Sequence, residues 1–136
     1  MYEYNVKVLR VIDGDTIDVD IDLGFSTVLK KKRIRLYGID TPESRTRDKE
    51  EKIRGIISKN YLLTKCPIGK YIRLKSHGVG KFGRILGELF EYNETSSIND
   101  EMCNEAYAVP YHGQSKEEIK RLHLENRQKL ISKGLL

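Results

Sequence analysis

The sequence predicts an α+β protein in which five strands close into a small barrel and three helices lie outside it. Two observations favour this fold. Apolar and polar residues alternate over residues 4–39 and again around residues 71–91, as they do in strands with one buried face. Apolar residues also recur at helical spacing after two capping patterns, which begin at Asp48 and at Ser115.

The N-terminal part is predicted to form three consecutive strands. The first covers residues 4–12 and ends at Asp13-Gly14, a dipeptide typical of tight turns. The second strand reaches Leu23 and has an apolar residue at every second position. Gly24-Phe25-Ser26 then turns the chain into a third strand, which we expect over residues 28–39.

The pairing of the second and third strands depends on the length of the turn between them. A two-residue turn places Asp18 opposite Arg33, whereas a three-residue turn shifts the partner by one residue. In either register acids face bases, which stabilises a hairpin by roughly 0.2–1 kcal/mol per pair. The same count places Arg35 opposite Thr16 or Asp15, beside the corner that joins the first two strands.

Two strands and three helices are expected in the remaining sequence. The first helix begins after the N-cap Asp48, with Glu51 at the third helical position, and ends before Pro67. Residues 71–75 and 84–91 are expected to form a strand pair. Asn99 or Asp100 is expected to cap a short helix that reaches about Tyr107. A capping box at Ser115 and Glu118 begins a last helix that ends at Gly134, with Ile119, Leu122 and Leu130 facing inward. Five strands with helices outside form an OB-fold, the common small closed barrel.

Length and composition set the class of protein. A chain of 136 residues predicts a single domain over residues 1–136 with a core of its own. The net charge of +5 favours anionic partners such as nucleic acid. Two cysteines, Cys66 and Cys103, make neither a disulfide scaffold nor a zinc site, so we expect buried free thiols.

The sequence carries no sign of a membrane or export segment. No apolar stretch approaches the roughly 20 residues needed to cross a bilayer, and no secretory signal precedes the first strand. The chain is therefore expected to be intracellular or already processed. We favour a cytoplasmic location over secretion, and the protein could be phage-encoded. We also expect a monomer that does not bind a membrane.

Two familiar motifs are matched only in part, and the histidines match no metal-binding motif. Residues 78–83 match the GxGxxG pattern, but a strand follows where a dinucleotide-binding motif needs a helix, so the glycines predict a hairpin. Asp18, Asp20 and Asp22 resemble the start of an EF-hand loop that lacks its glycine and its final glutamate. The histidines have no metal-ligand spacing.

Six residues at strand ends and turns remain as candidates for chemistry: Asp15, Arg35, Asp40, Thr41, Glu43 and Arg84. Two aspartates and a backbone carbonyl offer hard oxygen ligands, which suit Ca²⁺ or Mg²⁺. A nearby glutamate can orient or deprotonate a water, and two arginines can clamp a phosphodiester and neutralise charge on its oxygens. Together these residues indicate metal-assisted phosphodiester hydrolysis.

Residues 33–43 could also be a strand followed by a solvated acidic turn without a functional role, because Asp, Thr and Pro are ordinary turn residues.

Three segments of the chain resemble the staphylococcal nuclease (thermonuclease-like) family: Val11 to Thr16, Arg35 with Asp40 to Glu43, and Lys81 to Arg84. They occur in the family's order at closely similar spacings, and the resemblance covers essentially the whole chain. It implies an OB-fold barrel with three helices. It also implies a metal-dependent endonuclease that cleaves DNA and RNA at the 5′ P–O bond with Ca²⁺ as cofactor.

The resemblance also implies roles for the candidate residues. Asp15 and Asp40 would be the calcium carboxylates, with the Thr41 carbonyl as a further ligand. Glu43 would act on the attacking water, as base or as positioner. Arg35 and Arg84 would hold the scissile phosphate and stabilise the transition state.

Three more residues would contact the substrate. Lys81 and Phe82 fall where the family places a Lys-Tyr pair near the nucleotide, so Phe82 lacks the phenolic hydroxyl. Tyr111 lies near the position of the family's nucleotide-stacking tyrosines, just before the last helix. The segment between Glu43 and Asp48 is shorter than the mobile loop typical of the family.

Two rival functions are kept beside the nuclease. One is a catalytically inactive OB-fold module that binds nucleic acid or protein, whose signature would be gaps among the six positions. The other is a purely structural OB-like domain. Preference for DNA or RNA and endo- or exonucleolytic action stay open.

Overall fold

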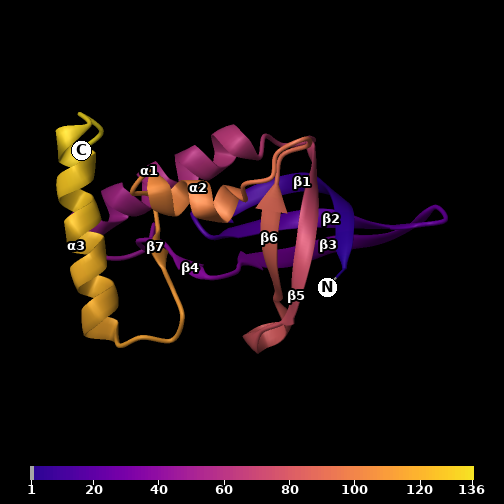
Figure 1. Cartoon of the computed structure of the whole chain (residues 1–136), viewed down its shortest axis with the longest axis horizontal. Coiled ribbons are helices and arrows are strands. Elements are labelled where there is room, and N and C mark those ends of the chain that lie inside the picture. Colours follow the sequence, from indigo (N-terminus) through magenta and orange to yellow (C-terminus); the bar gives the residue numbers. More distant parts are fainter. Residues whose placement is uncertain (1) are drawn as a thin grey trace.

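The computed structural model describes residues 2–136, and its main elements follow the expected order (Figure 1). The strands are β1 (Glu3–Asp13), β2 (Thr16–Gly24), β3 (Thr27–Leu36), β4 (Ile39–Asp40), β5 (Tyr71–Val79), β6 (Ile85–Phe90) and β7 (Val109–Pro110). The helices are α1 (Lys49–Lys65), α2 (Ile98–Asn104) and α3 (Lys116–Ser132), and a 3-10 turn, η1 (Lys81–Gly83), connects β5 to β6.

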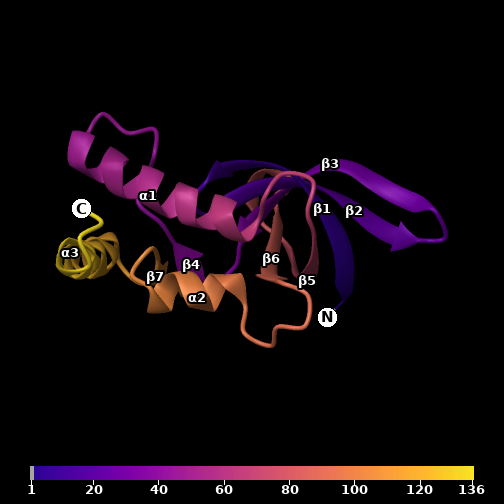
Figure 2. The ribbon, with the colours of Figure 1, turned by 90° about the horizontal axis from the view of Figure 1, so that it is seen from above.

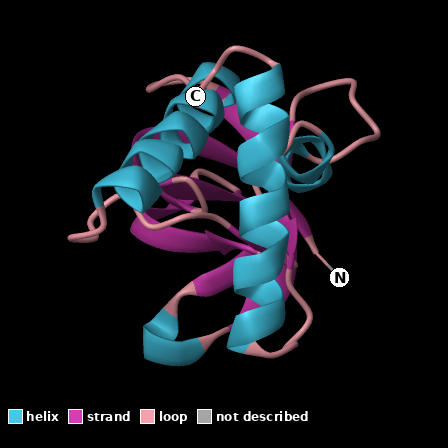
Figure 3. Ribbon diagram, turned by 90° about the vertical axis from the view of Figure 1, so that its left-hand side faces the viewer, coloured by secondary structure: helices cyan, strands magenta, loops and turns pink. Residues whose placement is uncertain are grey.

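Five of the strands close into a barrel in the order β1-β2-β3-β6-β5. The barrel is mixed, because β3 pairs with β6 in parallel while the other neighbours are antiparallel. The three helices lie to one side of the strands (Figure 3), and α3 stands at the end farthest from the β2–β3 turn (Figure 1). The predicted α+β fold, an OB-fold barrel with three helices, is confirmed. Within residues 2–136 no helix is long and apolar enough to cross a membrane.

Strands β2 and β3 continue past the barrel as a two-stranded arm (Figures 1 and 2). Asp18 pairs with Arg33, as the two-residue turn predicts, but β-bulges shift the register by one residue in the middle of the arm. β3 pairs with β6 only over its last three residues, so residues 27–33 have β2 as their one strand neighbour in the described chain. Arg35 lies opposite Thr16.

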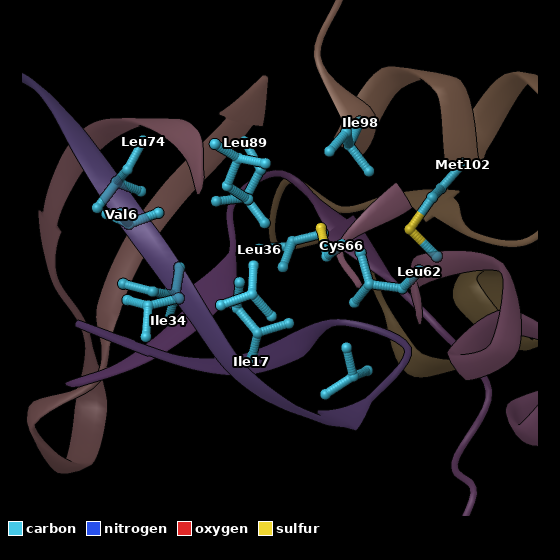
Figure 4. Packing of buried hydrophobic residues seen from close by; sticks show 14 of the residues in the cluster. Val6, Ile17, Ile34, Leu36, Leu62, Cys66, Leu74, Leu89, Ile98 and Met102 are labelled. Carbon is cyan, nitrogen blue, oxygen red and sulfur yellow. The ribbon is translucent and has the colours of Figure 1, made fainter. Parts of the chain in front are cut away.

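The apolar core fills the barrel and continues beneath the first two helices (Figure 4). Ile17, Ile34 and Leu74 are fully or almost fully buried inside the barrel, and Leu62 of α1 and Met102 of α2 extend the core toward the helices. Burial of this apolar surface is the main favourable contribution to folding. Both cysteines are free; Cys66 is buried, as expected, whereas Cys103 is only half-buried.

Two of the three predicted helix starts are confirmed. The Asp48 carboxylate accepts hydrogen bonds from the amides of Glu50 and Glu51, and Ser115 caps α3 by accepting from the Glu118 amide.

The predicted cap of α2 is wrong. Ser97 caps this helix by accepting from the Asp100 amide, and the helix ends at Asn104, before Tyr107. Asn99 is instead buried: it donates to the carbonyls of Tyr37 and Gly87 and accepts from the Leu89 amide. The side chain that resembled a cap therefore satisfies backbone groups of the barrel, which cannot reach water.

Some strand limits also differ from those expected. The third strand is interrupted after Leu36, because Gly38 takes a positive φ of 77° and turns the chain into β4. β4 then pairs with β7, outside the barrel. β5 extends to Val79, beyond the expected end at residue 75. The predicted hairpin over residues 78–83 is present and carries η1.

Helix α1 packs directly on the backbone of the turn that follows β4. A Cβ atom added to Gly55 would lie 2.5 Å from the carbonyl carbon of Glu43 and 2.6 Å from the Ser44 nitrogen. One helical turn later, Ser58 lies so close to Gly14 that a Cβ there would come within 2.9 Å of the serine Cβ. This close packing fixes the turn over residues 41–44 against the β1–β2 corner.

Candidate active site

A cavity of about 1440 Å³ opens between the β3–β4 turn, η1, the start of α1 and α3. Seven of the nine residues singled out in the sequence line it: Arg35, Asp40, Thr41, Glu43, Lys81, Arg84 and Tyr111. Asp15 does not line the cavity itself, but it contacts Arg35 from the turn between β1 and β2. Phe82 lies outside and lines a second cavity.

Arg35 joins the two candidate metal-binding aspartates. Its Nη2 atom lies 3.4 Å from Oδ2 of Asp15 and 3.6 Å from Oδ1 of Asp40. Its Nη1 atom donates to the carbonyl oxygens of Leu36 and Ile39, at 2.9 and 3.0 Å. The guanidinium is therefore oriented by backbone carbonyls while one nitrogen faces the carboxylates.

The environment of Asp15 opposes its ionisation. Burial raises the pKa of its carboxyl group, although Arg35 and a hydrogen bond from the Thr16 hydroxyl lower it in part. Thr41 is buried beside this region, and its Oγ1 has no hydrogen-bond partner within residues 2–136. An orphaned buried hydroxyl is costly without a ligand or water.

Glu43 lies at the rim of the cavity among other acids. Its backbone amide donates to Oε2 of Glu51 at 3.1 Å, which ties the turn to the first turn of α1. Burial raises the pKa of the Glu43 carboxyl group, and the negative charges of Asp13, Asp15 and Asp40 raise it further. This corner thus holds more negative charge than its own bases neutralise.

The other wall of the cavity comes from η1 and the segment before α3. Arg84 follows η1, and its Nε atom is buried without a hydrogen-bond partner among the described residues. Lys81 lines the same wall. Tyr111 is held by its backbone amide, which donates to the Gly38 carbonyl at 2.8 Å, and the residue is 44% exposed.

Two residues at the site were missed in the sequence. His123 of α3 places its Nε2 atom 2.8 Å from Oδ2 of Asp40. Arg54 of α1 is buried and lines the cavity, and its Nε atom lacks a hydrogen-bond partner in the described chain. His123 was set aside for its lack of metal-ligand spacing, and no local signal links it to an aspartate so distant in the sequence.

The oxygen donors around Arg35 are suited to a hard metal ion. No three Asp, Glu, His or Cys side chains of residues 2–136 come together as a metal cluster of their own. Asp15 and Asp40 nevertheless approach the same Arg35 nitrogen, and the unpartnered Thr41 hydroxyl lies in the same turn. Carboxylates with further oxygen donors fit a hard cation such as Ca²⁺ and would need water to complete its shell.

Comparison with known proteins gives the same family that the motifs suggested. Residues 33–135 match the family described as "Staphylococcal nuclease homologue". The chain is 29% identical to "Protein ParB" of Escherichia coli, over 95% of this chain and 71% of that protein. It is 34% identical to "Endonuclease YhcR" of Bacillus subtilis, over 80% of this chain and 9% of that protein.

A further relative matches a shorter segment of the chain, at a higher identity than the two relatives above. The chain is 50% identical to "Thermonuclease" of Staphylococcus hyicus over 31% of this chain and 21% of that protein. It therefore spans only a small part of the two relatives named as nucleases here. The family match covers most of the chain, and this protein belongs to the staphylococcal nuclease homologues.

Proposed function

We propose that this protein is a Ca²⁺-dependent nuclease that hydrolyses DNA and RNA at the 5′ P–O bond. The observation that carries the proposal is the convergence of Asp15, Asp40 and Arg35 at one edge of a cavity that Arg84 also lines. Family membership and relatives named as an endonuclease and a thermonuclease support it.

In this proposal the carboxylates of Asp15 and Asp40, with the Thr41 carbonyl, hold the ion. Bound Ca²⁺ would supply positive charge to a corner in which burial and neighbouring acids already disfavour ionised carboxylates. Because Lys81 and Arg84 also line the cavity, it offers a phosphate positive charge in addition to that of Arg35.

Arg35 and Arg84 bind the two non-bridging oxygens of the scissile phosphate and stabilise the charge that grows on them. Glu43 orients the attacking water and accepts its proton while the water oxygen bonds to phosphorus. The 5′ oxygen leaves and takes up a proton, so the products carry a 3′-phosphate and a 5′-hydroxyl. Lys81 and Tyr111 contact the nucleotide from the cavity wall.

The proposal predicts the effect of single substitutions on cleavage of labelled single-stranded DNA and RNA in Ca²⁺. Arg84→Ala is the sharpest variant, because Arg84 forms no ion pair within residues 2–136 that its loss would break. We expect Arg84→Ala, Arg35→Ala and Glu43→Gln each to lower the turnover by about 10²–10³-fold, the usual cost of removing one well-placed stabilising group.

Lys52→Ala is the matched control, because Lys52 is exposed on α1 and lines neither cavity. It should keep both the turnover and the melting temperature of the wild type. If the wild-type protein retards nucleic acid on a gel without cutting it, the protein is an inactive binding module and not a nuclease. Full activity of the Arg84→Ala variant would show that this arginine does not take part in catalysis.

A further inference from the structure

A second cavity, of about 530 Å³, adjoins the candidate active site. Arg84 lines both cavities. The turn between β5 and β6 separates them, since Lys81 faces the first cavity while Phe82 and Gly83 face the second. The remaining lining residues come from the base of the arm: Asp18, Lys31 and Arg33.

The second cavity carries a positive charge that is not neutralised by its own acid. Asp18 is the one acidic residue among those lining it, and Arg33 binds both of its oxygens, at 2.9 and 3.3 Å. Lys31 and Arg84 have no carboxylate partner among the described residues. They are therefore available to a phosphate.

Strand β3 leads from the active site to this cavity. Residues two apart on a strand face the same side, so Arg33 lies on the outward face that also carries Arg35, while Ile34 and Leu36 point into the core. Lys31 lies at a β-bulge, where its amide donates to Oδ1 of Asp20. Basic side chains thus continue along one strand from the candidate phosphate site toward the arm.

Two exposed phenylalanines mark the same route. Phe82 at the second cavity and Phe25 at the tip of the arm are almost fully exposed, at 94% and 103% of the reference area. Both have positive φ values, 61° and 54°, and so does Lys31, at 52°. Bulky side chains avoid this conformation, and a turn of this kind favours Asn or Gly. The folded chain gains nothing from these rings in water, which points to a role in binding.

We propose that β3 and the arm bind the part of the nucleic acid strand that flanks the cleaved bond. Lys31 would contact one of its phosphates, and Phe82 and Phe25 would stack on its bases. The inference rests on the proposed function, because it takes the cleaved phosphate to lie between Arg35 and Arg84.

The length of the strand sets the size of the bound segment. Ten residues separate Arg35 from Phe25, which at roughly 3.3 Å per residue is about 30 Å along the arm. A segment of that length exceeds a dinucleotide, so the affinity should rise with the length of the oligonucleotide. A protein that holds only the cleaved unit would bind short and long oligonucleotides alike.

Asparagine allows the contacts to be removed without straining the backbone, because it tolerates a positive φ better than other non-glycine residues. The test variant is Phe25→Asn/Lys31→Asn, at two positions that do not line the active-site cavity. The control variant is Ile68→Asn/Lys52→Gln, which removes one exposed apolar side chain and one lysine from surfaces that line neither cavity. All proteins carry Glu43→Gln during binding measurements in Ca²⁺, so that the probe stays intact.

Binding is measured by fluorescence anisotropy with thymidine oligonucleotides of about 4 and about 16 nucleotides, the range that single OB-folds bind. We expect the test variant to bind the long probe about 10-fold more weakly, as the loss of one stacked base predicts, and the short probe unchanged. The slope of log Kd against log salt for the long probe should fall by about 0.7, one phosphate contact to a single strand. The control variant should match its parent in every measurement.

Equal affinity of the test variant and its parent for the long probe would overturn the inference, as would a parent that binds both probes equally. Failure of the proposed function gives a different result. If the protein with Glu43 restored cuts neither probe, it is not a nuclease. A weaker binding of the long probe by the test variant would then still show that the arm binds nucleic acid.

Discussion

Arg35 contacts two carboxylates and two backbone carbonyls, and these contacts differ in strength. The hydrogen bonds from Nη1 to the carbonyls of Leu36 and Ile39 have ordinary lengths, at 2.9 and 3.0 Å. The distances from Nη2 to Asp15 and Asp40, at 3.4 and 3.6 Å, are longer than the roughly 2.7–2.9 Å of charge-assisted hydrogen bonds. The side chain is thus fixed by the backbone while Nη2 remains available to a phosphate oxygen.

Cys66 allows a prediction about pH and stability. Burial raises the pKa of its thiol from 9.0 to about 12. The folded state therefore keeps the proton that the unfolded state loses, and the contribution to stability is complete below pH 9 and lost as the pH rises toward 12. Across this range the free energy of unfolding should fall by about 1.4 kcal/mol per pH unit from this thiol.

Urea unfolding of the wild type and of Cys66→Ala, across a pH series through this range, checks the prediction. Tyrosines and lysines titrate in both proteins, so the difference between the two curves isolates the thiol. The alanine variant should start less stable and lose stability less steeply. Parallel curves would show that the thiol titrates equally in both states.

At the residue scale, what the sequence could predict depended on separation along the chain. The proximity of Asp15 and Arg35 could be predicted, because a short turn joins their strands and fixes which residues face each other. The contact between His123 and Asp40 could not, because 83 residues separate them and only tertiary packing brings α3 to β4.

At the element scale, α1 supports the candidate catalytic turn, and Gly55 is the contact point. Alanine would improve the helix propensity by about 1 kcal/mol. Its Cβ, however, would lie 2.5 Å from the backbone of Glu43, and overpacking of this kind costs roughly 1–3 kcal/mol. Because the obstacle is backbone, we expect the clash to prevail and the turn to move.

Gly55→Ala should therefore lower both the melting temperature and the cleavage rate, since a displacement of about 1 Å at a catalytic group can cost 10²-fold in rate. Asn60→Ala, at an exposed position of the same helix, serves as the control and should leave both unchanged. A Gly55→Ala protein with wild-type activity and raised stability would show that the helix propensity prevails and that the turn tolerates the shift.

The start of a helix could be predicted from the sequence where only one nearby side chain was suited to cap it. Asp48 and Ser115 each precede a helix with a glutamate three positions later, and both cap as expected. Around α2, Ser97, Asn99 and Asp100 are all residue types that cap helices, and only the packed barrel shows that Asn99 is needed elsewhere. The break at Gly38 and the bulges in the arm depend on backbone geometry that alternation alone does not encode.

At the scale of the whole molecule, the barrel gathers residues from distant parts of the chain. The turn after β4, η1 and α3 line one cavity, and the corner after β1 reaches its edge through the contact of Asp15 with Arg35. Family motifs indicated most of these residues, and periodicity indicated the strands that carry them. The position of Phe82, on the far side of η1, followed from neither, because it depends on a positive φ within the turn.

The central claim is that the acidic corner works with a bound cation. The most direct measurement is the initial rate of cleavage of labelled single-stranded DNA by the wild-type protein across a Ca²⁺ titration, ended by excess EDTA. We expect a rate that rises with Ca²⁺, saturates, and falls to background when the chelator is added. Cleavage that persists unchanged in EDTA, or no cleavage at any Ca²⁺ concentration, would contradict it.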